Sequence, residues 1–554
     1  MDIKLKTKVE AGATTQDIFD ALMESRGYKT KVQKEEFLHP VAPDLDYLLH
    51  ESGLKKSILN KAKKLLDSHL EKSSDICVFG DYDADGVSST AIMWQAITAY
   101  GKLQKSTSHI LPFMPDRHKH GYGLGDKAVS EVVSGEAFGH TSFTDYRPKL
   151  IITVDTGIVA HTGISTFKLA GIDTIITDHH LPAQAGLPES NCIVHTTATS
   201  GAGVAWIFAI YLLGDAAIRL VDLATIGVVG DMMPLVGLNR SICVEGLFAL
   251  TRTKRPGLVA MKEAMGVGSK DLSTYDISFG IAPRINAAGR IYNPLDALRL
   301  LCTSDTKQAK ELAAKIESHN KDRQEYTDSA LQSVAALKAK HKIIVIIGDY
   351  HEGVIGLVAG KLAELYNKPA IVMSDNGEVV KGSARSVAGV SITDLLRSLE
   401  TPFLGLGGHD QAAGFSIDKK NVKAMTKELE ALADKNITDE LLIKTHFADL
   451  KLDLTSTSLK LAKLISAMEP FGMHNQKPKF YFENLKVLED KQLGSSGKHR
   501  KLTVEQDGET RELMLFNTKL DYPLTHLSSA ICTIDINVWR DKESLQLIGS
   551  HVEI

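Results

Sequence analysis

Cysteine is scarce in this sequence. The chain has five cysteines among 554 residues, and they are odd in number, widely spaced and never arranged as CxxC. A disulfide framework needs an even set of paired cysteines, and a zinc finger needs closely spaced ligands, so the sequence indicates neither. We expect the thiols to be reduced and buried.

Long apolar runs are missing too. The longest, residues 204–213, is about half as long as the roughly 20 residues that a membrane helix requires. The first residues, Met1 to Lys4, lack the apolar segment of a signal peptide. These two absences predict a cytoplasmic protein without a membrane partner.

A strong excess of one charge is also absent, as is any low-complexity tract. The formal net charge is −4, with 43% hydrophobic and 24% charged residues, which is typical of a compact globular protein. Because domains usually hold about 100 to 200 residues, a chain of 554 residues predicts three or four of them. The net charge neither supports nor excludes a nucleic-acid partner, since bound divalent cations would neutralise part of the acidic total.

The pattern of short apolar runs predicts the fold class. From Asp75 onward such runs, at residues 76–79, 150–154, 172–177 and 191–194, alternate with helical stretches, as in βαβ units with a parallel sheet. A charged, nearly glycine-free segment favours one long helix before a second α/β segment, and short β-favouring runs near the end predict a small β-barrel. The predicted boundaries are 1–72 for an N-terminal helical lead-in, 73–235 for a first α/β lobe, 236–302 for a helical part of the same core, 303–342 for the connecting helix, 343–435 for a second α/β lobe, and 447–554 for the barrel.

Three carboxylates directly follow the first apolar strand. They are Asp81, Asp83 and Asp85 in the segment GDYDADG, and α/β sheets bind ligands at the carboxyl ends of their strands. A calcium-binding EF-hand loop also begins DxDxDG, but it requires a glutamate at its twelfth position, where this chain has Ile92. Alternatively, an aspartate at a strand-to-helix turn serves as a helix N-cap.

Three further acidic or imidazole segments follow apolar runs in the same way. Asp155 ends the second strand, Asp178-His179-His180 ends the third, and Asp231 ends a further apolar run. Each alone is equally compatible with a turn or core residue, but neighbouring strands direct their ends to one edge. Oxygen-rich ligation with one or two imidazoles suits Mn²⁺ or Mg²⁺, so we predict a site with two ions that activates water for phosphodiester hydrolysis.

These segments resemble a known family. GDYDADG, ITVDTGI, TDHH and ATIGVVGD resemble the four motifs of the DHH phosphoesterase superfamily, in an order and spacing similar to the RecJ exonuclease branch. The likeness continues through 284–290, 351–356 and 382–386, and 407–409 resembles the second-lobe motif called DHHA1. The resemblance implies DHH and DHHA1 lobes, an OB-fold barrel, and 5′ to 3′ degradation of single-stranded DNA with Mn²⁺ or Mg²⁺ in recombination and repair.

The resemblance also implies roles for individual residues. Asp155 would bridge the two ions, His180 would contact the scissile phosphate, and Asp178 would orient an imidazole. The implied metal ligands are Asp81, Asp83, Asp85, Asp155, His179 and Asp231.

A 5′-phosphate pocket is implied in the second lobe. Arg385 offers a forked donor and Ser383 a hydroxyl, with help from Arg290, and such a pocket would set the polarity of cleavage. Asn286 and His409 lie in matched motifs and are predicted to bind substrate as well. In the barrel Lys477, Lys479, Lys498, Arg500 and Lys501 either track phosphates or form a solvated face, and Tyr122 either stacks on a base or packs in its loop.

The predicted partner is therefore single-stranded DNA with a 5′ end, with single-strand-binding protein and a helicase as further candidates. One alternative is a DHH-family oligoribonuclease or dinucleotide phosphatase, but such relatives generally lack a terminal OB-fold. Another is a non-catalytic replication scaffold on the same fold. A scaffold would be expected to have lost metal carboxylates, all of which this chain retains.

Overall fold

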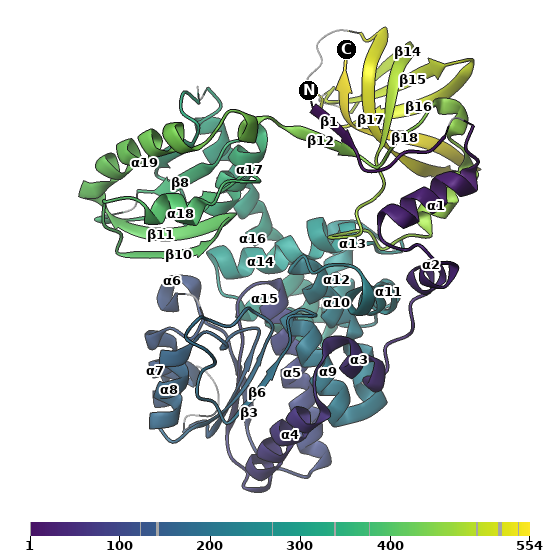
Figure 1. Ribbon diagram of the computed structural model, residues 1–554. Helices are drawn as coiled ribbons and strands as arrows, with labels where there is room; N and C mark the ends of the chain where they lie inside the picture. The colour runs from purple at the N-terminus through teal and green to yellow at the C-terminus, as the bar shows by residue number, and fades with distance from the viewer. Residues whose placement is uncertain are drawn as a thin grey trace.

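The computed structural model of this chain describes residues 2–10, 12–121, 123–139, 143, 145–268, 270–336, 339–375, 377–494, 497–518, 523–540 and 542–554. Two α/β lobes and a β-barrel make up most of it, with the first lobe at the bottom of Figure 1 and the second lobe and barrel above it. The predicted fold class is confirmed.

The first lobe is built on a five-stranded sheet in which every neighbouring pair is parallel. Four strands lie where the sequence predicts them. The edge strand β3 was missed, because it is only partly buried and contains Pro112, which suits an edge but weakens a strand pattern. In sheet order the strands are β3 (Ile110–Phe113), β2 (Ile76–Phe79), β4 (Leu150–Val154), β5 (Asp173–Asp178) and β6 (Cys192–His195).

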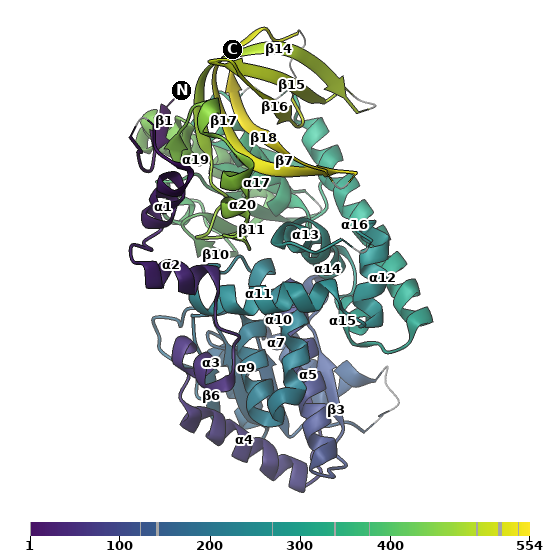
Figure 2. The same cartoon turned by 90° about the vertical axis from the view of Figure 1, so that its right-hand side faces the viewer.

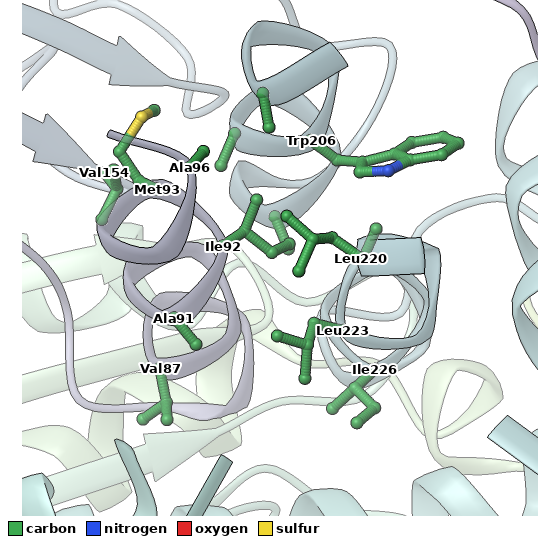
Figure 3. Close-up of a cluster of buried hydrophobic side chains, with 14 of the residues drawn as sticks. Val87, Ala91, Ile92, Met93, Ala96, Val154, Trp206, Leu220, Leu223 and Ile226 are labelled. Carbon is green, nitrogen blue, oxygen red and sulfur yellow. The ribbon is translucent and has the colours of Figure 1, made fainter. Parts of the chain in front are cut away.

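Helices cover both faces of this sheet. On one face α5 (Ala84–Leu103) packs against α9 (Gly201–Leu213) and α10 (Val221–Gly230), and Figure 3 shows Ile92 of α5 beside Leu220 and Leu223. On the other face α7 (Asp126–Ser134) and α8 (His161–Leu169) enclose a second apolar cluster.

The helical stretch from Gly201 to Gly230 is long and apolar enough, by length and composition alone, to cross a membrane. It is longer than the apolar run visible in the sequence because α9 and α10 follow each other with only a short helical turn between them. In this fold 61% of its most apolar window is buried, and both helices belong to the main hydrophobic core of the first lobe.

A group of helices and one long helix connect the two lobes. The long helix α16 spans Thr306–Ser333, so the predicted segment 303–342 is a helix for most but not all of its length. Figure 2 shows α16 running from the lower helices up toward the second lobe. The preceding helices are α11 (Gly237–Thr251), α12 (Pro256–Met265), α13 (Thr274–Asp276), α14 (Ala282–Ile291) and α15 (Leu295–Cys302).

The second lobe has a mixed sheet in which only β7 and β8 pair in parallel. Helices α17 (Ile355–Tyr366), α18 (Ile392–Arg397) and α19 (Val422–Asn436) pack on it. In sheet order the strands are β10 (Gly405–His409), β11 (Ala412–Asp418), β9 (Val379–Arg385), β8 (Ala370–Ser374) and β7 (Ile344–Gly348).

The terminal domain is a closed barrel. Strand β14 (Phe480–Leu493) pairs with both β15 and β17, so the sheet returns to its own first long strand. The remaining elements are β13 (Leu450–Lys451), α20 (Leu459–Ser466), β15 (His499–Gln506), β16 (Glu509–Leu515), β17 (His526–Trp539) and β18 (Lys542–Glu553).

The N-terminal segment differs from the predicted helical lead-in. It begins with a strand, β1 (Asp2–Leu5), that pairs in parallel with β12 (Thr445–Ala448) in the linker between the second lobe and the barrel. Helix α1 (Thr15–Ser25) then packs on the barrel core, whereas α3 (Leu45–Ser52) and α4 (Lys56–Glu71) pack on the first lobe. Helical periodicity shows which face of a helix is buried but not against which domain, so this division was not foreseen.

Candidate active site

Side chains from four distant segments meet at the carboxyl edge of the first sheet. His179 Nε2 lies 3.2 Å from Asp155 Oδ1, 3.7 Å from Asp85 Oδ2 and 3.6 Å from Asp231 Oδ2. His179 thus belongs to two groups that could hold a metal ion, one with Asp155 and His180 and one with Asp85 and Asp231. Because β2, β4 and β5 are parallel neighbours, the three segments that follow them lie at one edge of the sheet.

Asp231 reaches this cluster by a different route. The apolar run before it is helix α10, and Asp231 is the C-cap residue of that helix. Because α10 packs against α5, which begins in the segment GDYDADG, the end of α10 lies beside the first carboxylates.

Asp155 has an unusual backbone and an unsatisfied side chain. Its φ is +58°, a left-handed conformation that aspartate tolerates better than most residues, and its amide donates to Thr177 O at 3.0 Å. Both Asp155 Oδ1 and His179 Nε2 are buried without a hydrogen-bond partner among the described residues. Buried polar atoms are normally satisfied, so two such atoms facing each other fit a site that a cation completes.

The pKa shifts of the clustered carboxylates also indicate a cation site. Burial and then the neighbouring Asp85 raise the pKa of Asp155 well above its ordinary value. The same two causes, in the same order, raise the pKa of Asp231 to about 8. Carboxylates crowded in a buried site repel one another, and a divalent cation would relieve this repulsion.

Asp178 holds the loop that carries both histidines. Its Oδ2 accepts from Ile158 N at 2.8 Å, and its Oδ1 accepts from His179 N at 2.7 Å and lies 2.8 Å from His180 Nδ1. Burial raises the pKa of Asp178, but its hydrogen bonds outweigh that effect and lower it overall. The bond to Asp178 in turn raises the pKa of His180 to about 9. His180 therefore stands at the rim with its Nδ1 fixed.

Asp81 and Asp83 lie next to the two tight groups rather than in them. Asp83 is the N-cap of α5, where its Oδ1 accepts from Asp85 N and Gly86 N, both at 3.0 Å. Asp81 Oδ1 accepts from Tyr82 N at 2.7 Å. Both carboxylates contribute to the raised pKa of Asp155, so they are close to it. The N-cap alternative thus holds for one of the three aspartates.

A second, basic site lies between the two lobes. A pocket of about 490 Å³ is lined by Arg117 of α6 (Arg117–His120) and Arg290 of α14 on one side, and by Ser383 and Arg385 of β9 on the other. Burial and then Arg117 lower the pKa of Arg290 to about 10, and lower that of Arg385 as well. The shape and charge suit a phosphate group, since crowded guanidinium groups attract an anion.

Sequence reasoning missed several residues of this pocket. They are Arg117, Tyr82 and Lys381, the last of which pairs with Glu352 at 2.6 Å. Arg117 follows the carboxyl end of β3 by four residues, so recognising that edge strand would have found it.

The other predicted substrate residues are placed differently. Asn286 Oδ1 accepts from Ala84 N at 2.7 Å, so Asn286 fixes the start of α5. His409 is exposed at the end of β10 and is not among the residues that line the pocket. In the barrel Arg500 is buried and paired with Asp490 at 3.0 Å, so it is not available to track phosphates. Tyr122 lies outside the described residues.

A larger cavity of about 1270 Å³ is lined by Gly230 and Met232, on either side of Asp231. It therefore lies beside the group of candidate ligands Asp85, Asp155, His179 and Asp231, called the metal-ligand cluster below. Its walls come from the end of α10, from α14 and from the segment that precedes the barrel strands. The rings of Tyr275 and Phe279, 4.6 Å apart, are largely exposed there, while Lys477 and Lys479 line the barrel side. No sequence pattern predicted this cavity, because its residues come from separate domains.

Comparisons with known proteins place the chain among its relatives. The sequence matches family models described as "DHH family, N-terminal domain" over residues 75–230, "DHHA1 domain" over 340–435 and "RecJ OB domain" over 448–551. The single-stranded-DNA-specific exonuclease RecJ of Bacillus subtilis is 33% identical over 548 residues, which cover 95% of this chain and 67% of that protein. The protein of the same name from Haemophilus influenzae is 28% identical over 538 residues, 89% of this chain and 90% of that protein.

The fold is similar to a solved structure as well. The crystal structure of RecJ from Thermus thermophilus in complex with Mn²⁺ superposes with a TM-score of 0.78 at 25% identity. The match covers 100% of this chain and 80% of that one.

Proposed function

The chain belongs to the RecJ family of single-stranded-DNA-specific exonucleases, and we propose that it is itself a metal-dependent 5′ to 3′ exonuclease acting on single-stranded DNA in recombination and repair. The observation that carries the proposal is the meeting of Asp85, Asp155, His179 and Asp231 within hydrogen-bond or near-contact distance.

The residues of this cluster fit two Mn²⁺ or Mg²⁺ ions. Asp155 Oδ1 and His179 Nε2 are buried atoms without a hydrogen-bond partner among the described residues, and His179 is common to both groups. Asp155 is the proposed bridge because its segment resembles the family motif that supplies one. When bound, such ions lower the pKa of a coordinated water and balance the charge on the phosphoryl oxygens. The proposed ligands are Asp81, Asp83, Asp85, Asp155, His179 and Asp231.

The residues beside the cluster position the phosphodiester. His180 keeps Nδ1 on Asp178, so its Nε2 is left to hydrogen-bond an oxygen of the scissile phosphate. Asp178 acts through this bond and through the backbone amides of both histidines.

The basic pocket would set the direction of cleavage along the strand, from 5′ to 3′. Arg117, Arg290, Ser383 and Arg385 would hold a terminal 5′-phosphate at a fixed place relative to the metal ligands. A fixed end determines which bond reaches the ions, so nucleotides leave from the 5′ end. Asn286 holds the start of α5 and also lines the larger cavity, where it would face the strand, whereas His409 lines neither cavity.

The larger cavity and the barrel would bind the part of a long single strand that lies beyond the metal-ligand cluster. Exposed rings at Tyr275 and Phe279 can stack on bases, and Lys479 on the barrel side can contact phosphates. Its neighbour Lys477 is paired with Asp535. The barrel favours this reading over a dinucleotide phosphatase, and the complete carboxylate set favours it over a scaffold. A cytoplasmic location, and cooperation with single-strand-binding protein and a helicase, belong to the same proposal.

The test is digestion of single strands and duplexes of DNA and RNA, labelled at the 5′ or 3′ end, with Mn²⁺, Mg²⁺ or chelator. We expect early release of the 5′ label from single-stranded DNA only, and none with chelator. First release of the 3′ label would refute the polarity, and equal digestion of RNA would refute the substrate.

A further inference from the structure

The N-terminal end of α9 lies directly behind the metal-ligand cluster. Asp85 Oδ1 accepts from Ser200 Oγ and from Ala202 N, both at 2.9 Å, and Asp85 Oδ2 accepts from Gly201 N at 2.7 Å. Ser200 is also the N-cap of α9. All four residues are buried, so these bonds are shielded from water. The carboxylate of Asp85 is thus tied to a helix that contributes no metal ligand itself.

Two glycines let the helices approach the carboxylates. A Cβ on Gly201 would lie 2.6 Å from both Cβ and Oδ1 of Asp155. A Cβ on Gly227 of α10 would lie 2.2 Å from Asp85 Oδ1 and 2.4 Å from the Cβ of Ala202. Contacts this short do not occur, so any larger residue would displace one of the two carboxylates.

We propose that Ser200, Gly201 and Gly227 are positioning residues of the metal centre. Ser200 and the backbone amides of α9 fix the orientation of Asp85, and the two glycines keep room for both carboxylates to face His179. The positive end of the α9 dipole also offsets part of the negative charge that crowds the site. The inference rests on the proposed function, because it concerns the ions of the same centre.

The test measures Mn²⁺ binding by the full-length chain, by calorimetry and by the electron paramagnetic resonance of free Mn²⁺. Groups that orient metal ligands typically contribute about 10- to 100-fold in affinity, so we expect losses of that size for Gly201→Ala and Ser200→Ala. Gly227→Ala should weaken binding similarly, through Asp85. The melting temperature in chelator shows whether each variant is folded.

Gly203→Ala is the matched control in the same helix. Its Cβ would meet the side chain of Thr199, at 2.1 Å from Oγ1, and neither carboxylate. It should lower the melting temperature to a similar degree but leave Mn²⁺ affinity within about twofold of the parent chain. If Gly201→Ala does not fold, the Mn²⁺ affinity of Ser200→Ala tests the positioning role, because this substitution only removes an oxygen.

Two results separate this inference from the proposed function. Parental Mn²⁺ affinity in folded Gly201→Ala and Ser200→Ala, alongside lost binding in Asp155→Ala, would overturn the positioning role alone. Parental affinity in Asp155→Ala would instead overturn the metal centre.

Discussion

The metal-ligand cluster and the basic pocket are assembled in different ways. Every proposed metal ligand belongs to the first lobe, on segments that follow β2, β4 and β5 or end α10. The basic pocket needs Arg117 and Arg290 from one side and Ser383 and Arg385 from the second lobe. The first site therefore depends on the topology of one sheet, whereas the second depends on how two lobes are held.

The two sites carry opposite charges, and burial shifts the pKa values of their residues in opposite directions. Burial raises the pKa of Asp155 and Asp231 in the cluster and lowers that of Arg290 and Arg385 in the pocket. Each is a concentration of like charge that its own ligand would neutralise, a divalent cation in one case and a phosphate in the other. Because their residues and their ligands differ, a substitution in one site should leave the other intact.

The largest expected effect comes from Asp155→Ala. Loss of the carboxylate that we propose bridges two ions should reduce nuclease turnover by at least about 10³-fold, since metal-assisted catalysis supplies several kcal/mol of stabilisation. Turnover on labelled single strands measures this, with single-strand binding as the control, because the pocket and the barrel remain. Full turnover would contradict the shared-ion arrangement.

Arg385→Ala should have the next largest effect. A charge-assisted hydrogen bond contributes about 1.5 to 3 kcal/mol, so kcat/KM should fall roughly 10- to 100-fold on 5′-phosphorylated strands. On strands with a 5′-hydroxyl the same substitution should change little. Equal losses of kcat/KM on both substrates would show that Arg385 does not hold the terminal phosphate. As a control, the Mn²⁺ affinity of the variant should equal that of the parent chain.

Removal of metal should destabilise the first lobe. Mn²⁺ at about 100 times its Kd stabilises a folded site by about 2.7 kcal/mol, which corresponds to about 5 to 10 °C in melting temperature for a lobe of this size. We expect this shift on adding Mn²⁺ to chelated protein and expect Asp155→Ala to lose it. An equal shift in Arg385→Ala and in the parent chain would confirm that the two sites are independent.

The smallest effect is expected at the N-terminal strand. Lys6 N donates to Ala448 O at 3.0 Å in the linker that joins the second lobe to the barrel. Lys6→Pro removes that donor, whereas Lys6→Ala keeps it and removes only the ammonium near Asp449. We expect Lys6→Pro to shorten the DNA degraded per binding event about threefold, a change near 0.6 kcal/mol, without altering Mn²⁺ affinity. If Lys6→Ala shortens it equally, the strand pairing is not responsible.

Several predictions from the sequence rest on local rules. Asp155 and His179 follow buried strands, and the carboxyl ends of parallel strands share an edge, so their proximity follows from the strand order. The connecting helix was predicted from composition, although it ends at Ser333, before the predicted boundary. Arg500 shows the limit of such rules, because nothing in its neighbourhood predicts that it is buried against Asp490.

Local sequence is enough to place the carboxylates and imidazoles that follow the strands of the first lobe, because strand period, turn position and residue type all act over a few residues. Four features depend instead on the three-dimensional packing: the neighbours of Arg117 in the basic pocket, the cavity beside Asp231, the hydrogen bonds between Asp85 and α9, and the pairing of β1 with β12. Each of these contacts joins segments far apart in the chain. Their geometry is set by how whole domains pack, which no local periodicity encodes.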